Sequence, residues 1–132
     1  GDYSISNAGV LTKTANKNTA VILNIEGKDA VKNFDEILEV EHVDIYFVGL
    51  FDLSKALGIP GDVSNYLVLD ALAGIIEKAN KAGKFVGTIS TSKETMTEFL
   101  EMGIKYMVHL VDCEILRSGY ESAVDTFNQK IN

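Results

Sequence analysis

Four short runs of apolar and β-branched residues, separated by longer amphipathic stretches, constrain the fold of this chain more than any other feature. The runs cover residues 20–25, 43–48, 85–89 and 105–111. Nearly continuous apolar runs of this length are typical of parallel strands that are covered on both faces. Parallel neighbours need a crossover between them, usually a helix. The alternation therefore predicts an α/β fold, either an open parallel sheet or a barrel.

The stretches between the runs have helical periodicity and recognisable ends. Helices are expected at residues 28–40, 65–82, 92–102 and about 114–131, with a less regular piece at 10–16. Ser64 is a candidate N-cap, and residues 91–94 read as a capping box. Gly83 and Gly103 follow two of the helical patterns and are typical stop signals. The expected order alternates helix and strand from end to end.

Composition indicates one acidic domain spanning residues 1–132. The chain has 12 basic and 19 acidic residues, a net charge of −7, and Pro60 as its only proline, with no linker-like stretch. The acidic balance argues against nucleic-acid and anionic-membrane partners. No apolar run is long enough to span a bilayer, and residues 1–4 lack the features of a signal peptide. With a single cysteine, the sequence favours a cytoplasmic setting.

Two carboxylates occupy equivalent places after the first two predicted strands. Glu26 ends the first, and Asp52 lies just beyond the second, at the start of an apparent insertion at 49–64. The carboxyl ends of parallel strands meet at one edge of a sheet, where α/β proteins bind ligands. Paired carboxylates suit Mg²⁺ or Mn²⁺. Acidic residues at strand ends also cap helices or bind backbone groups, and spacing alone leaves these alternatives open.

At these residues the sequence resembles the HpcH/HpaI aldolase family, metal-dependent (class II) pyruvate aldolases related to the citrate lyase β-subunit. The resemblance is spread over residues 20–118. It is carried by Ile22-Leu23-Asn24-Ile25-Glu26, Asn33-Phe34-Asp35-Glu36-Ile37, Gly49-Leu50-Phe51-Asp52-Leu53-Ser54, Leu57-Gly58-Ile59-Pro60-Gly61, Ala82-Gly83-Lys84-Phe85-Val86-Gly87 and Leu116-Arg117-Ser118.

The resemblance implies about half of a (β/α)₈ TIM barrel, strands five to eight, and an aldehyde-lyase activity. Glu26 and Asp52 would be the ligands of a Mg²⁺ or Mn²⁺ ion that stabilises the enolate of a 2-oxo acid while a carbon–carbon bond breaks or forms. Backbone N–H groups of Gly49, Leu50, Phe51 and Asp52 would hold the substrate carboxylate. Retro-aldol cleavage would release pyruvate or a related oxo acid, together with an aldehyde.

Three departures from the family pattern bear on activity. Leu50 and Phe51 stand where the family usually has proline and alanine, and Asn24 stands where it usually has glutamine. The family's general-base histidine and its arginine would belong to the first half of the barrel, outside the matching region. His42 is expected in a surface loop and His109 in the core.

The remaining reactive side chains have structural interpretations. The lysines either begin strands or lie in helical patterns, so none fits a Schiff-base aldolase. Cys113 is expected to be a buried, inert thiol, Asp112 a helix cap and Arg117 a surface residue. The catalytic residues therefore stay unassigned.

Three hypotheses remain. The first is part of a metal-dependent 2-oxo acid aldolase that has little activity alone. The second is a non-catalytic half-barrel that serves as a binding or assembly module. The third is a flavodoxin-like sandwich with ligand-binding loops and no metal. Open strand edges, and apolar faces meant for the missing half of the barrel, also predict self-association, most simply as a two-fold homodimer, or pairing with a missing half-barrel.

Overall fold

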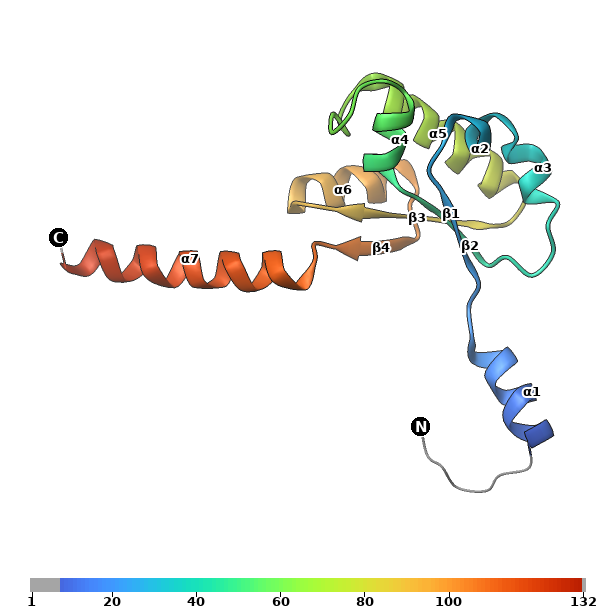
Figure 1. Cartoon of the computed structure of the whole chain (residues 1–132), viewed down its shortest axis with the longest axis horizontal. Coiled ribbons are helices and arrows are strands. Elements are labelled where there is room, and N and C mark those ends of the chain that lie inside the picture. Colours follow the sequence, from blue (N-terminus) through green and yellow to red (C-terminus); the bar gives the residue numbers. More distant parts are fainter. Residues whose placement is uncertain (1–7, 132) are drawn as a thin grey trace.

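The computed structural model describes residues 8–131, and residues 1–4, discussed above, lie outside this range. Helices and strands alternate through most of the chain (Figure 1). The elements are α1 (Ala8–Asn18), β1 (Ile22–Ile25), α2 (Lys28–Lys32), α3 (Phe34–Leu38), β2 (Ile45–Val48), α4 (Leu50–Ala56), α5 (Tyr66–Lys81), β3 (Phe85–Ser90), α6 (Lys93–Met102), β4 (Tyr106–His109) and α7 (Asp112–Ile131).

The four strands form one parallel sheet in the order β1-β2-β3-β4. Ile25 is paired with Val48, Phe47 with Gly87, and Gly87 with Tyr106, so the carboxyl ends of all strands meet at one edge. Each strand is hydrogen-bonded to its neighbour in sequence, as in successive β/α units of a barrel. The predicted α/β class and its parallel half-barrel arrangement are confirmed.

One hydrophobic core holds the sheet to helices α2–α6, which lie on one side of it (Figure 1). Tyr46 is its largest fully buried side chain, and the ring of Phe34 meets it edge to face at 5.2 Å between centroids. The Tyr46 hydroxyl donates a hydrogen bond to the carbonyl of Ile37. Burial raises the pKa of this phenol.

The opposite side of the sheet is uncovered, and we call it the open face. Because side chains alternate along a strand, the register places on it Ile22, Asn24, Ile45, Phe47, Phe85, Gly87, Ile89, Tyr106 and Val108. The rings of Phe47 and Tyr106 meet there across Gly87, where a Cβ would stand 2.7 Å from Cδ1 of Tyr106. The apolar runs predict strands covered on both faces, and in this chain only one face is covered. The uncovered apolar face is the one that the half-barrel interpretation leaves for the missing half, and the flavodoxin-like sandwich, which is covered on both faces, is excluded.

Several helix boundaries differ from the sequence expectation. The predicted 28–40 helix is broken at Asn33 into α2 and α3. The N-cap of α5 is Asn65, whose side chain accepts from the N–H of Leu67, rather than Ser64. The capping box of α6 joins Ser92 to Thr95, one position later than expected. The 49–64 insertion contains the short helix α4.

The first and last helices extend away from the sheet in different directions (Figure 1). None of the residues of α7 is buried. Within residues 8–131, no helix combines the length and apolarity that a membrane crossing requires.

Candidate metal and substrate edge

Glu26 and Asp52 lie at the same edge of two neighbouring strands, as predicted. Glu26 directly follows β1, and Gly49, at the corresponding place after β2, leads into the first turn of α4, which carries Asp52. The N–H of Gly49 donates to the carbonyl of Ile25 at 3.1 Å and so joins the two strand ends. Both carboxylates are exposed to solvent.

The side chain of Glu26 occupies the space that a side chain at Gly49 would need. A Cβ built on Gly49 would lie 2.9 Å from Cγ of Glu26 and 3.3 Å from its Oε1. Glu26 therefore leans across the second strand end, toward the helix that carries Asp52. The absence of a side chain at Gly49 permits this placement, a role that the sequence did not reveal.

Helix α4 is anchored so that its first turn is presented at the edge. The side chains of Leu50 and Leu53 are buried in the core, which leaves Phe51 and Asp52 on the outer side. The first N–H groups of a helix lack intrahelical acceptors. Because the Gly49 N–H already bonds to Ile25, the N–H groups left for a ligand are those of Leu50, Phe51 and Asp52.

Ser54 fastens the following loop to this turn. Its buried Oγ donates to the carbonyl of Phe51 at 2.6 Å and accepts from the N–H of Gly61 at 2.9 Å. The loop thus lies beside the ring of Phe51, which is 64% exposed. A Cβ on Gly61 would be 3.7 Å from that ring. Sequence reasoning missed Ser54, although a serine among buried leucines often signals a hydrogen bond to the backbone.

The donor set at this edge fits a hard divalent cation. Carboxylate oxygens are the ligands that Mg²⁺ prefers, usually one or two from the protein, with water and substrate oxygens completing the shell. Over residues 8–131 there is no group of three or more His, Cys, Asp or Glu side chains placed to hold a metal. Two carboxylates are thus not a complete protein site, and a cation held by Glu26 and Asp52 would need water and ligand oxygens to complete its coordination.

Two predictions about single residues are wrong. His109 is exposed rather than in the core, and its Nδ1 lies 2.9 Å from Oγ of the buried Ser90. Cys113 is exposed rather than buried. Both follow from one cause: β4 is an outer strand, and α7 extends away instead of packing back on it.

Other predictions about single residues are confirmed. His42 is exposed in a turn, with a φ of 63°. Arg117 lies on the surface of α7, where it forms ion pairs with Glu114 and Glu121 that raise its pKa. By contrast, Asp112 differs from its predicted role as the helix cap: it is the first residue of α7, the carbonyl of the preceding Val111 accepts from the N–H of Ile115, and Asp112 Oδ1 accepts from the N–H of the adjacent Cys113.

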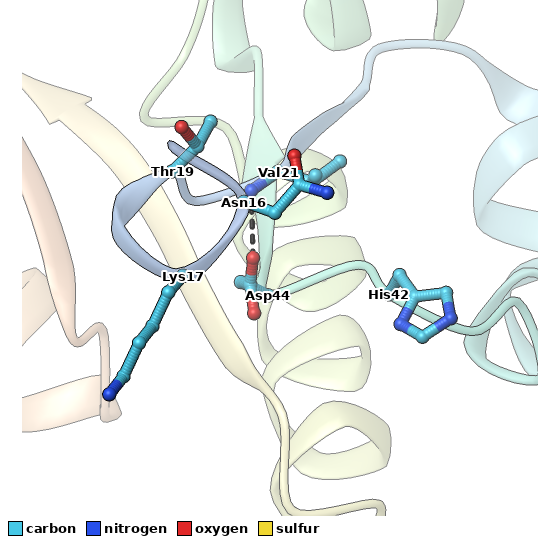
Figure 2. Close-up of a pocket in the computed structure, with 6 residues that line it drawn as sticks. All are labelled: Asn16, Lys17, Thr19, Val21, His42 and Asp44. Carbon is cyan, nitrogen blue, oxygen red and sulfur yellow. Dashed lines mark hydrogen bonds between the residues drawn. The ribbon is translucent and has the colours of Figure 1, made fainter. Parts of the chain in front are cut away.

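A separate cavity of ≈ 540 Å³ lies at the opposite end of the sheet. It is lined by Asn16, Lys17, Thr19, Val21, His42 and Asp44 (Figure 2). Val21 and Asp44 immediately precede β1 and β2, and the Asp44 carboxylate accepts from the N–H of Val21 at 2.7 Å, the dashed line in Figure 2. Asp44 is therefore used to join two strand starts, and this cavity does not include the Glu26–Asp52 edge.

The chain is built of parallel β/α units and carries two carboxylates at the carboxyl edge of its sheet. This architecture places it among the (β/α)-barrel proteins, as a segment of such a barrel. The family model described as HpcH/HpaI aldolase/citrate lyase matches residues 4–117. The chain belongs to the HpcH/HpaI aldolase/citrate lyase family.

Individual relatives agree with this assignment. A 5-keto-4-deoxy-D-glucarate aldolase of Escherichia coli O6:H1 is 34% identical over 115 residues, which cover 87% of this chain and 45% of the relative. The HpcH/HpaI aldolase of Desulfitobacterium hafniense DCB-2 superposes with a TM-score of 0.83 at 25% identity, covering 96% of this chain and 49% of that one. A family protein of Burkholderia cenocepacia J2315 gives 0.83 at 28% identity, covering 88% and 45%. The chain thus spans about half the length of these relatives.

Proposed function

We propose that this chain carries the metal- and carboxylate-binding part of a carbon–carbon lyase that acts on 2-oxo acids and releases pyruvate or a related oxo acid. The observation that carries the proposal is the placement of the Glu26 side chain over Gly49, directly before the turn that holds Asp52. Kinship with aldolases supports the reaction class.

Each residue at the edge has a distinct role in this proposal. Glu26 and Asp52 would hold Mg²⁺ or Mn²⁺, and the N–H groups of Leu50, Phe51 and Asp52 would bind the carboxylate of the oxo acid. When bound, the ion supplies Lewis-acid stabilisation of negative charge on the keto oxygen. Phe51, held beside Gly61 through Ser54, would border the entrance for the aldehyde.

Neither histidine lies beside Glu26 and Asp52. His42 is at the opposite end of the sheet. His109 ends β4 at the carboxyl edge, two strands away from β2, and its ring is bonded to the buried Ser90. Arg117, the only arginine of the chain, is held by two glutamates. We therefore expect the 132-residue chain alone to bind ion and oxo acid while releasing little pyruvate.

Ligand-dependent melting tests the binding part. Mn²⁺ together with oxalate, a stable mimic of the oxo acid, should raise the melting temperature, because a ligand at about 100 times its Kd stabilises a protein by about 2.7 kcal/mol. The shift should disappear in Glu26→Gln and Asp52→Asn and persist in Glu41→Gln, an exposed glutamate before β2. If Mn²⁺ and oxalate do not raise the melting temperature of the wild-type protein, the proposed site at Glu26 and Asp52 is wrong.

A retro-aldol assay for released pyruvate tests the catalytic part. Substantial turnover by the isolated chain that vanishes in Glu26→Gln would show that the base lies within these residues, contrary to our expectation.

A non-catalytic binding module is the second candidate, favoured by the positions of His109 and Arg117 and by the bulky ring of Phe51. It predicts binding of ion and oxo acid without turnover even after the complementary half of a relative's barrel is added. The proposed setting for either function is the cytoplasm, supported by a single cysteine with a free thiol.

A further inference from the structure

Within the described residues, three polar side chains are fully buried in the fold: Ser54, Thr88 and Ser90. Burial of a hydroxyl costs free energy unless the group is hydrogen-bonded. Alanine would occupy a helical position such as that of Ser54 without this cost, and valine has nearly the shape of threonine and the same preference for strands. The partners that the buried hydroxyls bind therefore indicate what these residues contribute.

Thr88, on β3, holds the end of β2. Its hydroxyl donates to the carbonyl of Val48 at 2.9 Å, one residue beyond the last register pair of β2 with β3. That carbonyl shares a planar peptide unit with the N–H of Gly49, which in turn donates to the carbonyl of Ile25. The Ile25 carbonyl shares its own peptide unit with the N–H of Glu26. Two hydrogen bonds therefore connect Thr88 to the backbone of Glu26.

Ser54 holds the first turn of α4 in a similar way. Its hydroxyl donates to the carbonyl of Phe51 at 2.6 Å, and this carbonyl shares a peptide unit with the N–H of Asp52. The hydroxyl oxygen accepts in turn from the N–H of Gly61 at 2.9 Å, so both its donor and its acceptor capacity are used. Because α4 has only seven residues, it has few internal hydrogen bonds, and the bond from Ser54 supplements them. Ser54 thus restrains the backbone of Asp52.

The third buried hydroxyl serves another part of the sheet. Ser90 lies at the end of β3, and its Oγ is 2.9 Å from Nδ1 of His109, its register partner on β4. This pair lies away from the two strand ends that carry the proposed metal ligands. Ser90 is therefore a natural comparison for the other two hydroxyls.

Each of the two proposed metal ligands thus has a backbone that is held by one buried hydroxyl. We propose that Thr88 and Ser54 are positioning residues of the metal and substrate edge. Thr88 fixes the strand end that carries Glu26, and Ser54 fixes the turn that carries Asp52, so the two carboxylates keep a constant placement relative to one another. Neither hydroxyl is itself a ligand, since both are buried and bonded to the backbone. This inference rests on the function proposed above.

Calorimetric titration with Mn²⁺ tests Thr88 through a pair of substitutions. Thr88→Val keeps the branched shape and removes the hydroxyl, whereas Thr88→Ser keeps the hydroxyl and removes a methyl group. Thr88→Val should lower the affinity for Mn²⁺ on the order of tenfold, and Thr88→Ser should bind Mn²⁺ as the wild type does. An equal loss in the two variants would show that packing matters and the hydroxyl does not, and would overturn the role of Thr88.

Ser54→Ala tests the second hydroxyl, and Ser90→Ala is its matched control, because both remove a fully buried serine hydroxyl. Ser54→Ala should lower the affinity for Mn²⁺ on the order of tenfold, and Ser90→Ala should leave it unchanged. Gly61 is exposed and can donate to water once the Ser54 hydroxyl is gone, so Ser54→Ala is expected to fold, and urea denaturation checks this for every variant. Equal affinities in Ser54→Ala and Ser90→Ala would overturn the role of Ser54.

The wild-type titration separates these positioning roles from the proposed function. A wild type that binds neither Mn²⁺ alone nor Mn²⁺ with oxalate would overturn both. A wild type that binds, together with unchanged Mn²⁺ affinity in Thr88→Val and Ser54→Ala, would overturn the positioning roles alone and leave the proposed site intact.

Discussion

A methyl group added at Gly49 would stand 2.9 Å from Cγ of Glu26, a distance that forces one of the two to move. The neighbour is a flexible side chain, so relief comes from displacing the carboxylate rather than the backbone. The conformation of one proposed metal ligand therefore depends on the residue beside it, and the cost of a side chain at position 49 should appear in ion binding more than in stability.

Gly49→Ala should accordingly lower Mn²⁺ affinity on the order of tenfold, the usual effect of disturbing a residue that positions a metal ligand. Calorimetric titration with Mn²⁺ measures it. Gly27→Ala is the matched control, since Gly27 lies at the same edge with nothing within 4 Å of its Cβ position, and it should bind as the wild type does. Wild-type affinity in Gly49→Ala would contradict the proposed role.

Tyr46 gives the fold a predictable response to alkaline pH. Its pKa in the folded state is raised by burial above the value near 10 that the unfolded chain has. Above about pH 10 the unfolded state therefore binds fewer protons than the folded state, and the free energy of unfolding falls as pH rises. The contribution of the neutral Tyr46 phenol to the free energy of unfolding is fully present below about pH 10.

Urea denaturation between pH 8 and pH 11 should show this decline in the wild type and a shallower decline in Tyr46→Phe, which keeps the ring against Phe34. Tyr66→Phe, at a residue that is 75% exposed, is the control and should keep the wild-type slope. Equal slopes in all three proteins would show that the buried phenol does not contribute.

At the level of elements, the residue that caps the start of α5 differs from the one that the sequence predicts. Asn65 caps the N–H of Leu67 at 3.1 Å, whereas the hydroxyl of Ser64 bonds to Asp62 at 3.3 Å on the surface. Asn65→Ala should therefore lower the free energy of unfolding by about 1 kcal/mol. Ser64→Ala should change it by less than about 0.5 kcal/mol. Urea denaturation measures both, and a larger loss in Ser64→Ala would restore the sequence-based N-cap.

The elements also show how far sequence alone could predict the fold. The four strands and most helices were predictable because apolar runs and amphipathic periodicity are local signals. The break at Asn33 and the helix inside the 49–64 segment were not, since short helices depend on tertiary packing more than on propensity. The position of Glu26 and Asp52 at the carboxyl edge of the sheet was predictable, because each residue follows a predicted strand. The roles of Gly49 and Ser54 were not, because each depends on a residue from another segment.

At the level of the whole molecule, burial was the least predictable property. The apolar runs predict strands that are covered on both faces. The open face shows that the same pattern also occurs in a sheet that this chain covers on one face only. The wrong expectations for His109 and Cys113 have the same origin. Burial near β4 depends on what packs against an outer strand, and neither the strand nor α7 carries that information in its own sequence.

The order β1-β2-β3-β4 also has a consequence for how the chain folds. Every strand pairs with the strand that precedes or follows it in sequence, so no pairing has to wait for a distant part of the chain. Loop closure is then shortest for β3 with β4 and longest for β2 with β3, where α4 and α5 intervene. The sheet can grow one β/α unit at a time, and synthesis on the ribosome would deliver the units in the order in which they pair.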